Sequence, residues 1–170
     1  MSISVVEIIK SAFSFLNDWI KYPLDKLSKK KEHDKALYKE IAGIIGTEMM
    51  RDFFITLGYN RYYFKQSHDI GTYFNFIDRV DKYFFDKKIQ KSREDFDSEL
   101  FKLMEFLSVH FFIPHMPREV DYYALYPDKE DTKEYYEMYK QREAEFASLY
   151  TSVEKKYEAY VKVVKKRLII

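Results

Sequence analysis

The four histidines are the residues of this chain with the widest chemical repertoire. They are His33, His68, His110 and His115, and the chain has no cysteine. A metal site needs ligands that converge, such as two histidines or a glutamate and a histidine at helical spacing. Neither His-x₃-His nor Glu-x-x-His occurs, so His110 and His115, which flank a predicted helix end near Glu105 and Glu119, are the only candidates for metal ligation. The lack of cysteine excludes a disulfide scaffold, a thiolate metal site and a thiol nucleophile.

A second pattern joins an arginine to a histidine. Arg61 and His68 enclose the six residues 62–67, a spacing that resembles the Arg-x₄₋₆-His motif of the HEPN-domain ribonucleases. The resemblance implies a small helical bundle that often dimerises, in which Arg61 and His68 would act on RNA without a metal. It covers eight residues of 170, and Tyr62 stands where a polar residue usually follows the arginine. A metal-independent ribonuclease or toxin is therefore an alternative function.

The charges nearly balance, with 29 basic and 28 acidic residues. This composition does not indicate a polyanion-binding protein. Basic residues nevertheless gather in two short segments: Lys26, Lys29, Lys30 and Lys31, and then Lys162, Lys165, Lys166 and Arg167. The second group complements a helix C-terminus and could also touch phosphates, which keeps nucleic-acid binding as an alternative. Only four glycines occur and none builds a phosphate loop, so we expect no cofactor and no small-molecule ligand.

Aromatic residues make up 19% of the chain, and one long segment combines tyrosines with prolines. Residues 113–130 contain three of the four prolines and the tyrosines Tyr122, Tyr123 and Tyr126. Loops longer than about 12–15 residues are uncommon in compact domains and are often functional. This segment is therefore predicted to be a long aromatic loop that contacts a partner.

Helix breakers and apolar periodicity predict the elements that position these residues. The predicted helices cover 3–20, 35–57, 72–90, 93–112 and 131–168. Asp34 is expected to cap the second helix, and Ser92 with Asp95 to open the fourth. Gly43 and Gly46 inside the second helix suggest the close approach of a neighbouring helix. The sequence thus predicts an all-α fold: a single domain, 1–170, that forms an elongated bundle of about five helices with one aromatic loop.

The last predicted helix is too long for a compact globule. About 37 residues at 1.5 Å each span roughly 55 Å, whereas a 170-residue globule has a radius of gyration of about 15–16 Å. Its apolar and tyrosyl stripe continues to the C-terminal end, and uncovered aromatic surface usually marks an interface. We therefore expect a homodimer or a stable complex through residues 146–168, with Tyr157 and Tyr160 as contacts.

The N-terminal segment allows two interpretations. Residues 3–20 carry an amphipathic stripe that includes Val5, Ile9 and Leu16, and the lysine run follows it. The stripe could belong to the core, or residues 1–31 could form a peripheral helix that lies on a membrane surface. Glu7 and Lys10 interrupt the apolar stretch, so we expect neither a signal peptide nor a membrane-spanning helix.

These observations lead to one principal functional expectation. The protein is predicted to be a cytoplasmic, non-enzymatic interaction or regulatory protein that acts through a helix face or through the 113–130 loop. A protein partner or a second copy of the chain is the expected ligand. The composition, rich in Lys, Ile, Phe and Tyr, suits an AT-rich bacterial or phage genome.

Overall fold

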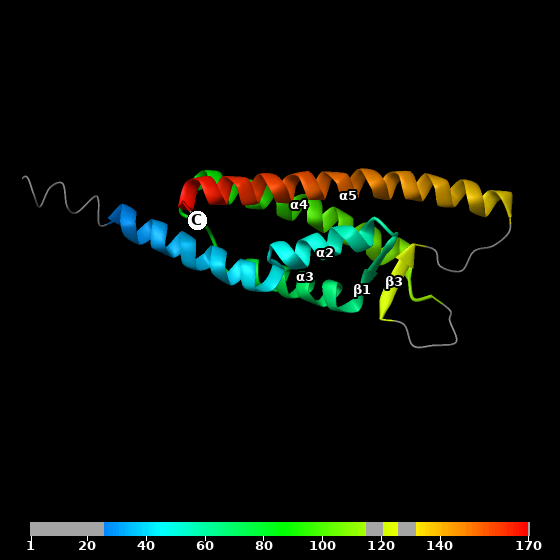
Figure 1. The fold of residues 1–170 in the computed structure, drawn as a ribbon, viewed down its shortest axis with the longest axis horizontal. Coiled ribbons are helices and arrows are strands. Elements are labelled where there is room, and N and C mark those ends of the chain that lie inside the picture. The colour runs from blue at the N-terminus through cyan, green and yellow to red at the C-terminus, as the bar shows by residue number, and fades with distance from the viewer. Residues whose placement is uncertain (1–25, 115–120, 126–131, 170) are drawn as a thin grey trace, which may run out of the picture.

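The computed structural model describes residues 26–114, 121–125 and 132–169. Helices dominate this part of the chain, and a small sheet closes one end (Figure 1). The helical segments are 26–45, α2 (Thr47–Leu57), α3 (Phe64–Ile77), α4 (Lys87–His110) and α5 (Lys133–Leu168). The mostly helical fold is confirmed, although joining the first two segments across Gly46 gives four helices in the described residues. The predicted helix 3–20 lies outside those residues.

The bundle is elongated because its long helices lie along one common direction (Figure 1). α4 and α5 pack against one another over many turns, and helix 26–45, α2 and α3 form the opposite layer (Figure 1). α5 has 36 residues, which corresponds to about 54 Å of helix. Its first turns extend past the ends of α2 and α4 (Figure 1).

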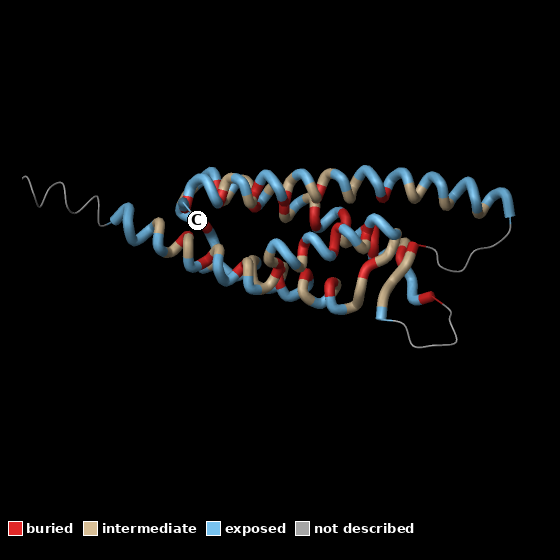
Figure 2. Tube along the Cα trace, viewed as in Figure 1, coloured by how far each residue is buried: buried red, intermediate tan, exposed pale blue. Residues whose placement is uncertain are grey.

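Aromatic side chains fill the space between the two layers, where the buried positions lie (Figure 2). The ring of Phe96 stacks on that of Tyr160, with centroids 6.1 Å apart, and lies 5.3 Å from that of Tyr157. The predicted stripes of α4 and α5 are largely confirmed, since these residues are buried: Phe96, Leu100, Leu103, Leu107, Phe146, Val153, Tyr157, Tyr160, Val164 and Leu168. Val80, which falls inside the predicted helix 72–90, is 96% exposed because α3 has already ended at Ile77.

Two predicted helix starts differ from the structure because other residues provide the caps. α4 begins six residues before the predicted start, since the side chain of Asp86 accepts hydrogen bonds from the amides of Lys88 and Ile89. Ser92 therefore lies inside the helix. Asp34 is not a cap either, because helix 26–45 continues through it and its side chain is buried.

The predicted helix 35–57 is broken at Gly46. The backbone of Gly46 is extended, with φ −66° and ψ 172°. A Cβ at this position would lie 2.4 Å from the carbonyl oxygen of Ala42, so the break itself excludes a side chain. A Cβ on Gly43 would meet nothing within 4 Å. The expected approach of a neighbouring helix is thus wrong for Gly43, and at Gly46 the close neighbour is the chain's own backbone.

A three-stranded antiparallel sheet replaces part of the predicted aromatic loop. Its strands are β1 (Arg61–Tyr63), β2 (Phe111–Phe112) and β3 (Tyr122–Leu125), in the order β1-β3-β2. The tyrosine run is therefore the central strand, with Tyr62 opposite Tyr123 and Phe111 opposite Leu125. In the part of the chain that the structure covers, no helix is long and apolar enough to cross a membrane.

Candidate functional site

The structure places Arg61 and His68 in different surroundings. Arg61 lies in β1, where its guanidinium carbon is 5.6 Å from the ring centre of Tyr59 and 5.7 Å from that of Tyr122. Such distances are typical of cation–π contacts. His68 lies on the exposed side of α3 and lines a groove that Arg61 does not line. The ribonuclease hypothesis stays a prediction.

The groove beside His68 lies at the break between helix 26–45 and α2. It has a volume of about 580 Å³ and is lined by backbone at Gly46 and by polar side chains of α2 and α3. Lys65 and Asp69, both in its wall, form an ion pair of 2.7 Å. The two charges of this pair neutralise each other, and Glu48 adds a negative charge to the lining. The groove therefore has no strong preference for an anionic ligand.

Of the two histidines considered as metal ligands, only His110 lies within the described residues. His110 ends α4 with its ring centroid 4.4 Å from that of Phe106. Burial lowers the pKa of His110, and the positive charge of Arg142 lowers it further. Among the described residues no group of three His, Asp or Glu side chains could hold a metal ion. His115 lies outside those residues.

The predicted contact tyrosines have structural places in the fold. The ring of Tyr123 stacks on that of Tyr62 at 5.1 Å, and the ring of Tyr122 meets that of Tyr63 edge-on at 6.3 Å. Tyr126 lies outside the described residues. Tyr157 and Tyr160 are only 8% and 1% exposed, and their rings contribute to the core of one chain. The interface expected through these two tyrosines stays a prediction.

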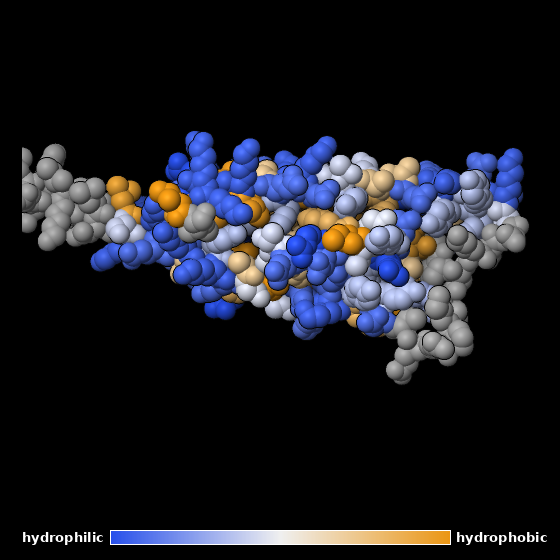
Figure 3. Space-filling model, viewed as in Figure 1, coloured by the Kyte–Doolittle hydropathy of each residue, from blue (hydrophilic) through white to orange (hydrophobic). Residues whose placement is uncertain are grey.

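A surface that the sequence did not reveal lies at the sheet end of the bundle. Asn60 donates hydrogen bonds to the Tyr139 hydroxyl at 3.3 Å and to Glu143 at 3.1 Å, so the end of α2 lies beside the first turns of α5. Here Ile55, Tyr59 and Tyr136 are 53%, 70% and 60% exposed. We call these three residues the docking surface. An apolar patch over α2 is visible in Figure 3.

A second unpredicted feature is a buried carboxylate. The hydroxyl of Tyr73 donates a hydrogen bond to Asp97, and Arg93 lies 3.6 Å from the other carboxylate oxygen. Burial raises the pKa of Asp97 to about 6. A carboxyl group with such a pKa suits acid–base chemistry. Asp97 lines neither the groove beside His68 nor a second groove, which is formed by residues of helix 26–45, α4 and α5, so we assign it a structural role.

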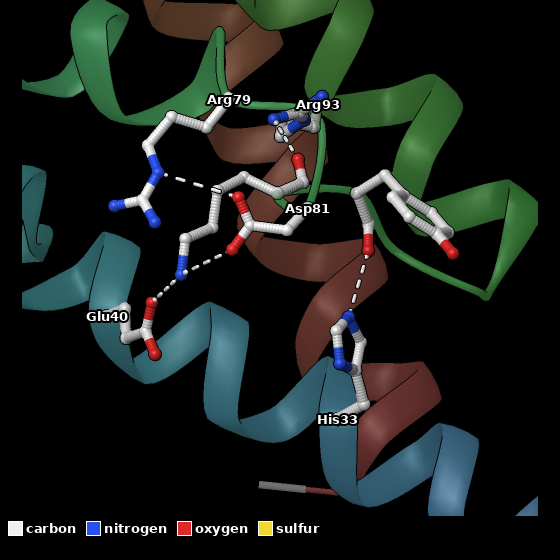
Figure 4. Close-up of polar contacts among 7 residues, drawn as sticks. His33, Glu40, Arg79, Asp81 and Arg93 are labelled. Carbon is white, nitrogen blue, oxygen red and sulfur yellow. Dashed lines mark hydrogen bonds and ion pairs between the residues drawn. The ribbon is translucent and has the colours of Figure 1, made fainter.

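The loop 78–86 is fastened to helix 26–45 by polar contacts (Figure 4). His33 Nε2 lies 3.2 Å from the carbonyl oxygen of Tyr83, and Lys82 Nζ lies 2.6 Å from Glu40. Arg93 donates to the carbonyl oxygen of Lys82 at 3.2 Å. These contacts hold the loop in place at the end of the bundle opposite the sheet.

Comparison of the chain with known protein families, with curated proteins and with solved structures gives no match.

Proposed function

We propose that this chain is a non-enzymatic helical interaction protein that binds a second copy of itself through the docking surface. The observation that supports this proposal best is the exposure of Tyr59 and Tyr136 beside turns of α5 that extend past the bundle. Residues 133–145 contain no fully buried residue, and the first one in α5 is Phe146.

Contact with a partner would stabilise an exposed helix end of this kind. Short helical segments that bury no apolar face are marginally stable in water. A tyrosine buries roughly 150–250 Å² when it is covered, and tyrosine is enriched in protein interfaces. Covering Tyr59 and Tyr136 would therefore stabilise the projecting turns as well as the complex.

A second copy is the first partner to consider because closed two-fold dimers are the commonest oligomers. In such a dimer the same surface faces itself, so the docking surface must be self-complementary. Lys140 lies over the ring of Tyr136 at 5.7 Å, and Glu137 is exposed next to it. Across a two-fold axis, Lys140 of one copy can therefore meet Glu137 of the other copy beside the ring of Tyr136.

The test is sedimentation of the full chain over a range of concentrations. We expect the wild-type protein to dimerise with increasing concentration. The double variant Tyr59→Glu/Tyr136→Glu should remain monomeric with an unchanged circular dichroism spectrum, because both side chains are exposed. The matched control is Val80→Glu, an exposed apolar residue in the loop at the far end of the bundle, which should dimerise like the wild type. A wild-type monomer at high micromolar concentration would exclude self-association as the function of this surface.

A further inference from the structure

A basic groove lies at the end of the bundle opposite the sheet, where three helices meet. It has a volume of about 550 Å³. Its cationic side chains are Lys30 and Lys31 from helix 26–45, Lys87 and Lys88 from the start of α4, and Arg167 from the end of α5. Segments that are far apart in the sequence thus place five positive charges around one space.

The two acids in the groove are already engaged by other groups. Asp34 is 2% exposed and accepts hydrogen bonds from the amides of Phe85 at 2.8 Å and Asp86 at 2.9 Å. Asp86 Oδ2 lies 2.6 Å from both Nε and Nη2 of Arg167. Burial opposes ionisation of Asp86, but the hydrogen bonds from Arg167 and from two backbone amides outweigh it and lower its pKa. These contacts hold the walls of the groove in place. They also pair the positive charge of Arg167 with the carboxylate of Asp86.

Among the described residues, the four lysines have no acidic partner. None of the ion pairs between described residues includes Lys30, Lys31, Lys87 or Lys88. The Nζ atom of Lys30 lies 5.5 Å from the centre of the Phe85 ring. Like charges held around one space repel each other, and an anionic ligand would relieve that repulsion. The groove therefore favours a ligand with several negative charges.

Apolar side chains are exposed beside these lysines. Leu27 and Phe85 line the groove and are 62% and 39% exposed, and Ile169, which follows α5, is 76% exposed. Apolar and basic groups alternate at this end of the molecule in Figure 3. Lysines that surround apolar side chains suit the interface of an anionic bilayer, whereas phosphate contacts to a nucleic acid need no apolar neighbours.

We propose that this groove binds the phosphate-bearing headgroups of an anionic phospholipid membrane. Lys30, Lys31, Lys87 and Lys88 contact the headgroups, and Leu27 and Ile169 enter the interfacial layer. This binding uses the end of the bundle opposite the docking surface, so it does not depend on self-association.

The test is flotation of the full chain with phosphatidylcholine vesicles that contain or lack phosphatidylserine. We expect binding only to the anionic vesicles, and weaker binding as salt screens the lysines. The double variants Lys30→Gln/Lys31→Gln and Lys87→Gln/Lys88→Gln should each lower the partition coefficient about tenfold or more. The matched control Lys133→Gln/Lys155→Gln removes two exposed lysines that form no ion pair in the structure, and it should bind like the wild type. Leu27→Ser should weaken binding at constant charge.

Three outcomes would overturn the proposal. The first is an equal loss in the groove variants and the control, which would indicate attraction by net charge alone. The second is unchanged binding in both groove variants, which would assign any membrane contact to another part of the chain. The third is absence of vesicle binding. If inorganic phosphate or a single-stranded RNA then binds, and the groove variants abolish that binding, the groove recognises a free anion or a nucleic acid in place of a membrane.

Discussion

The hydroxyl of Tyr73 donates a hydrogen bond to the carboxylate of Asp97 at a point where α3, α4 and α5 meet. Arg93 lies close enough to favour the ionised form of Asp97, and the negative charge of Glu94 opposes ionisation. The charge of Asp97 in turn contributes to a raised pKa of Tyr160. Burial raises the pKa of Asp97 to about 6, although Tyr73 and Arg93 favour the ionised form. The fold therefore binds a proton at Asp97 more tightly than the unfolded chain does.

This pKa difference predicts a pH dependence of stability. Because the folded pKa is higher than the ordinary value of 3.8, the favourable contribution of protonated Asp97 is complete below about pH 4 and is lost as the pH rises through about 6. The free energy of unfolding of the wild type, relative to that of Asp97→Asn, should fall by on the order of 2–3 kcal/mol over this range. Urea denaturation of both proteins at pH 4, 5, 6 and 7 measures the difference. A constant difference at all four values would contradict a raised pKa.

Substitution of Asp34 should lower the free energy of unfolding more than substitution of most other polar residues in the described part of the chain. Replacing it with alanine leaves the amides of Phe85 and Asp86 without their acceptor in a buried place. We expect Asp34→Ala to lower the free energy of unfolding by about 2–5 kcal/mol, since hydrogen bonds to a charged group are the stronger kind. Chemical denaturation measures this loss. Glu32→Ala, an exposed acid on the same helix, is the control and should change stability by less than about 0.5 kcal/mol.

The helices were predictable because their signals are local. In α4 and α5 the apolar residues recur at helical spacing over many turns, and this pattern identified most of the core correctly. The errors occurred where distant partners decide the structure. Asp34 has the residue type of a cap, but its acceptor oxygens are used by a loop 51 and 52 residues later. β1 and β2 are three and two residues long, and they exist only because β3 pairs with both.

The candidate surfaces were harder to predict for the same reason. The lysine run at residues 26–31 and the basic C-terminal turn were visible in the sequence, but nothing local indicated that Lys87 and Lys88 join them in one groove. The spacing of residues along the helix also does not predict that Tyr136 is exposed and Tyr160 is buried. Both tyrosines occur in the same long helix, and only the position of the neighbouring helices decides which one is covered.

Substitutions at Tyr160 should distinguish a core residue from an interface residue. Its ring is 1% exposed and its hydroxyl has no hydrogen-bond partner among the described residues. We expect Tyr160→Phe to leave stability unchanged or to raise it by up to about 1 kcal/mol, because an unsatisfied buried group is removed. Tyr160→Glu would bury a charge without a partner and should prevent folding. Circular dichroism and thermal unfolding measure both effects, and a folded, monomeric Tyr160→Glu protein would show that this ring faces a partner after all.

The glycines provide a set of substitutions with opposite expected signs. At Gly46 a Cβ would lie 2.4 Å from the carbonyl oxygen of Ala42, which is backbone and cannot move aside cheaply. Gly46→Ala should therefore destabilise the protein by about 1–3 kcal/mol as the break between the two helices shifts. Gly43 and Gly71 lie inside helices with open space around the new methyl group, so Gly43→Ala and Gly71→Ala should each stabilise by about 0.5–1 kcal/mol. Denaturation midpoints of the three single variants test the contrast. If Gly46→Ala also proved stabilising, the helix would continue through residue 46 and the groove beside His68 would not have the shape described above.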